Sequence, residues 1–282
     1  MMKAYIEILR PVNAFMAVVS IILMALIGWK FNLKVLLAAA VVFMATGAGN
    51  VINDYFDYEI DAINRPGRPI PSGRIRREVA GVYAMGLFIL ASMFGFYLGS
   101  LPGFIVAGSS LLMIYYAHTL KRECFIGNFV VSFLTGLSFV FGGIIVGETV
   151  KAAYIGLYAF LMTMAREIIK DMEDIEGDKM EGAKTLPIKY GHKTSSIIAA
   201  IFIFIASLTS PILYIIKIFS ILYIPILAIA IIVFLKAAFK ILSDPRRETA
   251  TRVSKQIKIG MGITFIAFAL GSETLTKIIL GI

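Results

Sequence analysis

Nine apolar segments, each close to the length that spans a bilayer, restrict the fold of this chain more than any other feature. They lie at about residues 13–29, 34–56, 78–99, 102–119, 125–147, 152–172, 194–216, 219–240 and 257–280. A helix of about 20 apolar residues crosses the hydrocarbon core. Hydrophobic residues make up 59% of the 282 positions and the mean hydropathy is +0.86, whereas soluble domains are roughly half apolar. We therefore predict an all-α polytopic membrane protein with nine transmembrane helices, organised as one domain over residues 1–282.

The basic residues indicate how the chain is oriented in the membrane. Its net charge of +9 would suggest nucleic-acid binding in a soluble protein, but Lys and Arg are concentrated before the first segment and after the even-numbered ones. The connections on the other side contain only Lys30, Lys34, Lys151, Lys217 and Lys277. The positive-inside rule therefore predicts a cell-membrane protein with a cytoplasmic N-terminus, an outside C-terminus and no nucleic-acid partner.

Six aspartates form two groups with the same spacing, near the cytoplasmic ends of the second and sixth segments. They are Asp54, Asp57 and Asp61, and Asp171, Asp174 and Asp178. Steps of three and four residues return to one face of a helix, so each group predicts a column of carboxylates. One alternative is a solvated face where a helix leaves the membrane. The mutual repulsion of like charges and the repeated spacing favour two catalytic columns that face each other and bind a divalent cation.

The likeness of the two regions continues downstream of the aspartates. Pro69-Ile70 precede Gly73 in the same order in which Pro187-Ile188 precede Gly191, which indicates an internal duplication. The connections that contain these residues, at about 57–77 and 173–193, each run roughly twenty residues. Connections of that length are often lids or binding loops, so we expect them to form a cytoplasmic cap over both columns.

Oxygen ligands at the membrane edge indicate magnesium. His118, His192 and Cys124 are the only residues of their types, too few for a zinc-type site. Magnesium commonly shares phosphate oxygens with a substrate, so we expect a diphosphate. Nearby basic residues would neutralise phosphate charge, although each also suits a positive-inside anchor. The basic candidates are Arg65, Arg68, Lys121, Arg122 and Lys184, and the neutral ones are Asn50, Asn53 and Asn128.

Glycines and phenylalanines alternate along the fifth segment, as at Phe133, Gly136 and Phe139. Small residues allow helices in a membrane to approach closely, and this is one interpretation of the glycines. The other is that some of the rings line an apolar cavity.

Four segments of the chain resemble the signature segments of the UbiA superfamily of intramembrane prenyltransferases. They are Arg10-Pro11-Val12-Asn13, NDYFDYEID followed by NRPGRP, HTLKR followed by Gly127-Asn128, and KDMEDIEGDKMEGAKTLP. The resemblance covers nearly the whole chain. It implies nine helices around a central cavity, with a cytoplasmic cap formed by the loops after helices 2 and 6. Within the superfamily, the overall likeness is to the archaeal branch that makes the second ether bond of archaeal membrane lipids.

The resemblance also implies a reaction. A geranylgeranyl group would pass from geranylgeranyl diphosphate, through an allylic carbocation, to the free hydroxyl of geranylgeranylglyceryl phosphate. Asn53 and the six aspartates would hold two Mg²⁺ ions on the diphosphate, and Arg68, Lys121 and Arg65 would neutralise its remaining charge. A phosphorylated acceptor is repelled by that diphosphate and needs cations of its own, for which Lys3, Arg10 and Lys184 are candidates. No obligatory protein partner is evident.

Three alternatives stay open on the sequence. A UbiA-type enzyme with an aromatic acceptor, such as 4-hydroxybenzoate or a naphthoate, would have a similar composition. A cation-coupled transporter would place its acids at mid-depth, whereas both columns fall at the ends of segments. A CDP-alcohol phosphotransferase would carry Asp-Gly and Ala-Arg ahead of its later aspartates, an arrangement that neither column shows. No general base stands out, because an interfacial residue such as His118 is more often merely solvated.

Overall fold

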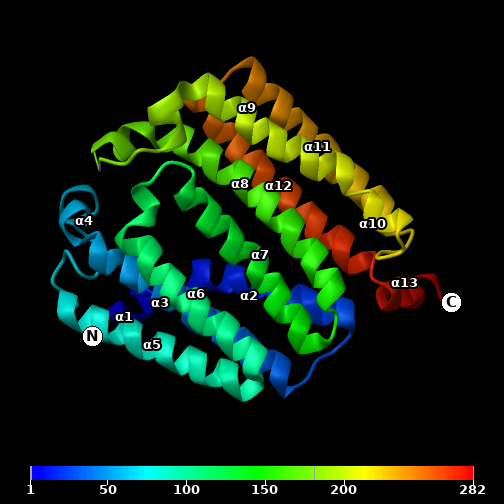
Figure 1. Cartoon of the computed structure of the whole chain (residues 1–282), viewed down its shortest axis with the longest axis horizontal. Coiled ribbons are helices and arrows are strands. Elements are labelled where there is room, and N and C mark those ends of the chain that lie inside the picture. The colour runs from blue at the N-terminus through cyan, green and yellow to red at the C-terminus, as the bar shows by residue number, and fades with distance from the viewer. Residues whose placement is uncertain (1, 181, 282) are drawn as a thin grey trace.

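Helices packed side by side form the whole architecture of the computed structural model, which describes residues 2–180 and 182–281. The two ends of the chain lie at opposite ends of the bundle (Figure 1). The helix bounds are α1 Met2–Ile8, α2 Pro11–Gly28, α3 Leu33–Phe56, α4 Tyr58–Asn64, α5 Arg77–Leu98, α6 Ser100–His118, η1 Leu120–Arg122, α7 Ile126–Val146, α8 Thr149–Met180, α9 Leu186–Thr209, α10 Ile212–Ile215, α11 Tyr223–Ser243, α12 Arg247–Leu270 and α13 Glu273–Leu280.

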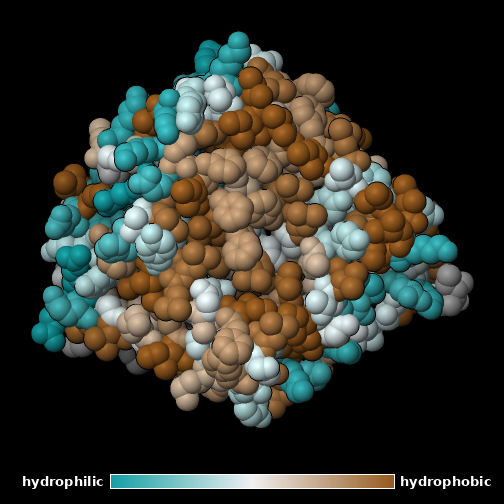
Figure 2. All heavy atoms as spheres, in the orientation of Figure 1, coloured by the Kyte–Doolittle hydropathy of each residue, from teal (hydrophilic) through white to brown (hydrophobic). Residues whose placement is uncertain are grey.

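Nine segments in the described part of the chain are long and apolar enough to cross a membrane, and they confirm the predicted number of spans. They are α2, α3, α5, α6, α7, α8, the pair α9–α10, α11 and α12. Hydrophobic residues cover most of the face shown in Figure 2, while hydrophilic ones gather along the edge where α4 lies and near α13. This distribution suits a bundle that is surrounded by lipid and has two polar ends.

The ninth span begins ten residues earlier than the sequence pattern predicts. It is α12, which starts at Arg247, and the residues after Leu270 form the separate helix α13. Basic residues in the first turns of α12 make this stretch look like a connection, but they belong to a helix that continues from the polar end into the apolar layer. At the other end Gly271 packs against Tyr223, and the Ser272 side chain caps the new helix by accepting from Leu275 N at 3.4 Å.

Both predicted cap loops contain helix, and the second is mostly helical, which corrects its description as a loop. The region 57–77 contains α4, and most of 173–193 is taken up by the end of α8 and the start of α9; residue 181 lies outside the described residues. α6 begins at Ser100, so the connection between α5 and α6 is the single residue Gly99. The likeness of the two regions extends to backbone geometry, since Gly73 and Gly191 have φ values of 74° and 78°. The cap and the duplication stay predictions.

Glycines at the centre of α7 and α8 allow these two helices to approach each other closely. A Cβ atom on Gly136 would lie 2.6 Å from the carbonyl oxygen of Gly156, and the reverse contact is equally short. Gly142 likewise faces Ile21 and Met24 of α2. The close-packing interpretation of the glycines in the fifth span therefore holds at these positions.

Substitution of Gly136 by Ala should destabilise the protein. Because the new methyl group would overlap the backbone of α8, the two helices have to separate, at a cost of roughly 1–3 kcal/mol. Thermal unfolding in detergent measures this effect. The matched control is Gly262→Ala in α12, where no heavy atom lies within 4 Å of the added Cβ. Equal unfolding temperatures for the two variants would contradict the packing argument.

Candidate active site

The first aspartate column lies where α3 ends and α4 begins. Asp54 is in the last turn of α3, Asp61 is in α4, and Asp57 joins the two helices with φ −85° and ψ 6°. The prediction of one continuous helical face is therefore wrong for this column, because the helix breaks after Phe56. Asp54 and Asp61 are nevertheless almost fully buried, at 2% and 5% exposure.

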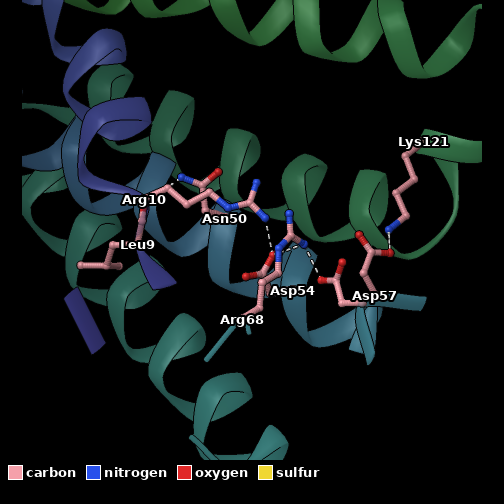
Figure 3. Close-up of polar contacts among 8 residues, drawn as sticks. Leu9, Arg10, Asn50, Asp54, Asp57, Arg68 and Lys121 are labelled. Carbon is pink, nitrogen blue, oxygen red and sulfur yellow. Dashed lines mark hydrogen bonds and ion pairs between the residues drawn. The ribbon is translucent and has the colours of Figure 1, made fainter. Parts of the chain in front are cut away.

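Two arginines pair with these buried carboxylates (Figure 3). Arg10, at the junction of α1 and α2, donates through Nη2 to Oδ1 of Asp54. Arg68, between α4 and α5, donates through Nη1 to the same Asp54 oxygen at 3.2 Å and also to Oδ2 of Asp61. Burial of a carboxylate is costly unless a cation compensates its charge. Arg68 thus draws Asp54 and Asp61 together across the break in the helix.

Lys121 completes the charge pairing of the first column. It lies in η1, between α6 and α7, and its ammonium group contacts Oδ1 of Asp57. The Lys121 and Asp57 side chains are only 12% and 17% exposed. A segment distant in sequence therefore supplies a cation to the column, while the predicted role of Lys121 on the diphosphate stays a prediction.

The second aspartate column lies on one helix, as predicted. Asp171, Asp174 and Asp178 all belong to the C-terminal turns of α8. Asp171 is partly buried and accepts a hydrogen bond from Nδ2 of Asn128, at the start of α7, at 2.8 Å. Asp174 is exposed, whereas Asp178 is partly buried. Asn128 therefore orients the innermost carboxylate of the column.

Tyr116 of α6 lies near residues of both columns. Its phenol is within electrostatic range of Asp57 from the first column and of Asp171 and Asp178 from the second. Glu167, one turn before Asp171 on α8, acts on the same phenol. Sequence reasoning missed both residues. The four-residue step from Glu167 to Asp171 extends the second column and could have revealed Glu167, while nothing in the local pattern singles out Tyr116.

Among the remaining candidates, some side chains are used in hydrogen bonds that hold the fold, and others are exposed and could bind a substrate. Asn50 donates to the carbonyl oxygen of Leu9 at 2.9 Å, so its amide is used to hold the end of α1. Arg65, Lys3 and Lys184 have exposed side chains. The prediction grouped Arg10 with Lys3 and Lys184 as cations distant from the diphosphate ligands, whereas the structure places Arg10 directly on Asp54.

Arg122 and Lys184 lie next to each other, beside the second column. The backbone N–H of Lys184 donates to the carbonyl oxygen of Arg122 at 2.8 Å, which joins the connection after α8 to η1. Nε of Arg122 is buried without a hydrogen-bond partner among the described residues. His118 is exposed, and its Nδ1 lies 2.7 Å from Oγ1 of Thr119.

The donor set of the two columns fits a hard divalent cation. Within the described residues, no three His, Cys, Asp or Glu side chains are gathered as a preformed metal cluster. Oδ1 of Asn53 is buried with no hydrogen-bond partner in the described structure, next to Asp54 in sequence. It adds a neutral oxygen to the carboxylates, and magnesium is bound by such oxygen ligands together with substrate phosphates.

A nine-span helical bundle with paired aspartate columns at one end is the architecture of an intramembrane prenyltransferase. The chain belongs to the UbiA prenyltransferase family, whose model matches residues 13–267. It is a multi-pass membrane protein, and family membership favours an enzyme over the transporter alternative.

Particular relatives narrow the comparison. Digeranylgeranylglyceryl phosphate synthase of Methanothermobacter thermautotrophicus is 65% identical over 98% of this chain and 99% of its own length. The enzyme of the same name from Methanosphaera stadtmanae is 49% identical over 96% and 100%. A solved structure described as digeranylgeranylglyceryl phosphate synthase in membranes has a TM-score of 0.88 at 40% identity and covers 97% of this chain and 99% of that one. A UbiA homologue from Archaeoglobus fulgidus bound to GPP and Mg²⁺ has the same fold, with a TM-score of 0.67 at 19% identity and coverage of 94% and 99%.

Proposed function

We propose that this protein transfers a geranylgeranyl group from geranylgeranyl diphosphate to the free hydroxyl of geranylgeranylglyceryl phosphate, with magnesium. The product carries the second ether bond of an archaeal membrane lipid. The observation that carries the proposal is the meeting of two aspartate columns, three basic side chains and Tyr116 at one end of an apolar bundle. The names of the relatives at 65% and 49% identity support the choice of substrates. The chain acts as a single domain.

Magnesium would be held by oxygens of both columns. The proposed ligands are Asn53, Asp54, Asp57, Asp61, Asp171, Asp174 and Asp178. The bound metal would neutralise diphosphate oxygens and stabilise the leaving group. The A. fulgidus homologue bound to GPP and Mg²⁺ supports a prenyl diphosphate and this metal.

The basic residues orient and neutralise the diphosphate. A guanidinium carries five N–H donors, so an arginine that contacts a carboxylate through one nitrogen keeps donors for phosphate oxygens. Arg10 and Arg68 contact Asp54 in this way, and Lys121 is held by Asp57. Cations fixed beforehand by carboxylates need little reorganisation as charge builds up on the departing diphosphate. Arg65 adds an exposed positive charge at the rim.

An apolar cavity between α3, α6 and α7 suits the prenyl chain. Its lining includes Val41 and Ala45 of α3, Met113 of α6, and Leu134 and Phe141 of α7. These helices also carry Asp54, Tyr116 and Asn128 at their polar ends, so the cavity lies below the site within the bundle. A chain held there keeps the allylic centre away from water, which would otherwise quench the carbocation.

The acceptor phosphate lies near Arg122 and Lys184. Lys184 has an exposed side chain, and its backbone N–H is bonded to the carbonyl oxygen of Arg122, so two basic residues are neighbours beside the second column. Arg binds phosphate in a bidentate manner and Lys as a point charge. Lys3 is less suited because it lies on α1, beside the first column. With the positive-inside rule, this end of the bundle is cytoplasmic.

The proposal is tested by incubating purified protein with geranylgeranyl diphosphate, Mg²⁺ and a panel of acceptors, with products identified by mass spectrometry. We expect an ether product from geranylgeranylglyceryl phosphate and none from 4-hydroxybenzoate or a naphthoate. Lys184→Gln should raise KM for the phosphorylated acceptor roughly threefold or more and leave KM for the diphosphate unchanged. Lys255→Gln, at an exposed position of α12, is the control. Preferred use of an aromatic acceptor would overturn the assignment.

A further inference from the structure

The two arginines that meet on Asp54 come from segments that are joined to each other outside the site. Arg10 lies two residues after the end of α1 and directly before α2, and Arg68 belongs to the segment 65–76, which connects α4 with α5. The backbone N–H of Arg10 donates to the carbonyl oxygen of Glu7 at 3.0 Å. Arg10 has a left-handed backbone with φ 50°, which is unusual for a residue with a side chain. The direction of its side chain therefore depends on how the end of α1 is held.

Glu7 also forms a bidentate ion pair with Arg74. Nη1 of Arg74 lies 2.6 Å from Oε2 of Glu7, and Nη2 lies 2.8 Å from Oε1. The same guanidinium donates to the carbonyl oxygen of Gly67 at 2.6 Å and, through Nε, to Oγ of Ser72 at 3.0 Å. Because a guanidinium is planar and rigid, these bonds fix two points of segment 65–76 relative to α1.

The bonds of Arg74 lie on both sides of Arg68. The carbonyl of Gly67 belongs to the peptide group that precedes Arg68. Oγ of Ser72 donates to the carbonyl oxygen of Arg68 itself at 2.6 Å. Both peptide groups of Arg68 are thus connected to Arg74, one directly and the other through Ser72. Any movement of Arg74 is transmitted to the backbone from which the Arg68 side chain reaches Asp54.

Apolar contacts below these bonds hold the same segments together. Ile8 of α1 packs with Ile70 and Ile75 of segment 65–76, and their exposures are 1%, 3% and 3%. The Glu7 and Arg74 side chains are 43% and 41% exposed. An exposed ion pair usually contributes only about 0–1 kcal/mol to stability. The apolar cluster therefore contributes most of the stability of the contact between α1 and segment 65–76, and the polar bonds determine how the two segments are oriented.

We propose that Glu7 and Arg74 form a clasp that positions Arg10 and Arg68 on Asp54 and so sets the affinity for the substrate's diphosphate. Both are positioning residues, since they act through the two arginines. The inference rests on the proposed function, in which Arg10 and Arg68 bind that group. The hydrogen bond from Arg74 lowers the pKa of Glu7. The carboxylate therefore stays ionised at neutral pH and in mild acid, and the ion pair with Arg74 persists there.

Glu7→Gln is the primary test, because it removes one exposed charge and leaves the apolar contacts in place. The dissociation constant of inorganic pyrophosphate with Mg²⁺, measured by calorimetry, should rise roughly threefold or more, as should KM for geranylgeranyl diphosphate. The unfolding temperature and kcat at saturating substrate should change little. Arg74→Gln should have a larger effect, because it also frees Gly67 and Ser72. Adding Glu7→Gln to that variant should weaken binding no further.

A second exposed ion pair provides a matched control. Nε and Nη2 of Arg246 contact the two carboxylate oxygens of Asp244 at 2.6 and 3.0 Å, in the turn between α11 and α12. Asp244→Asn should leave pyrophosphate binding unchanged. In an Arg68→Gln background, Glu7→Gln should weaken pyrophosphate binding by a smaller factor, because Glu7 can then act only through Arg10.

Unchanged pyrophosphate affinity in Glu7→Gln would overturn the clasp, and so would an undiminished effect in the Arg68→Gln background. A wild-type protein that binds pyrophosphate but transfers no prenyl group would overturn the proposed function instead. The two failures are therefore distinguishable.

Discussion

Excess EDTA should reduce prenyl transfer to background, and added Mg²⁺ should restore it. The physical reason is the charge of the site. Arg10, Arg68 and Lys121 already compensate the first column, whereas Asp171 of the second column accepts a hydrogen bond from the uncharged amide of Asn128. A diphosphate carrying about three negative charges would meet strong repulsion from these carboxylates, of several kcal/mol at short range even with screening. A divalent ion bound between the carboxylates and the diphosphate attracts both, so the net interaction becomes favourable.

The measurement is product formation by mass spectrometry before chelation, after it and after readdition of metal. Thermal unfolding recorded in parallel shows that the protein stays folded without metal. Full activity in excess EDTA would eliminate the metal-dependent reaction for this chain.

Asp57→Asn and Asp171→Asn should each lower kcat by about a hundredfold to a thousandfold or more. Asn keeps the shape of the side chain, and its Oδ1 can still accept the hydrogen bond from Lys121 at position 57 or from Asn128 at position 171, so each variant removes little besides the charge. Asp171 is a sharper choice than Asp174, because Asp174 is exposed whereas Asp171 is partly buried and oriented. Steady-state rates at saturating substrates and Mg²⁺ measure the effect.

Asp244→Asn is the control for lost negative charge. Asp244 lies in the turn between α11 and α12, and hydrogen bonds from Arg246 and Thr249 keep the pKa of its carboxyl far below the ordinary range. It is therefore ionised whenever the enzyme is assayed. Near wild-type rates for both Asp57→Asn and Asp171→Asn, in folded protein, would identify the columns as a solvated face with no role in the reaction.

The number of spans could be predicted from the sequence because lipid requires long apolar helices, and composition records that requirement directly. Helix ends were harder to place. The first ten residues of α12 and the last turns of α8 are polar, and they extend the helices beyond the apolar layer. A hydropathy pattern measures the thickness of the membrane and not the length of the helix, so it cannot detect such extensions.

Residue types and their spacing predicted the two aspartate columns, but not how the columns are held. The break after Phe56 allows Arg68 to contact Asp54 and Asp61 together, and local periodicity contains no sign of it. Contacts across 44 and 64 residues bring Arg10 to Asp54 and Lys121 to Asp57. Such pairings depend on how helices pack, so distance along the chain misplaced Arg10 and gave no indication of Tyr116.

The position of the two chain ends bears on how the protein should be handled. Residues 3–10 lie within the machinery of the site, since Glu7 holds Arg74 and Arg10 reaches Asp54. The C-terminal helix α13 lies at the opposite end of the bundle (Figure 1). An affinity tag or fluorescent fusion on the N-terminus would load α1 and disturb the very contacts to be measured. The same fusion placed after α13 would sit at the end of the bundle away from the aspartate columns, which makes that end the suitable attachment point for purification and for surface immobilisation.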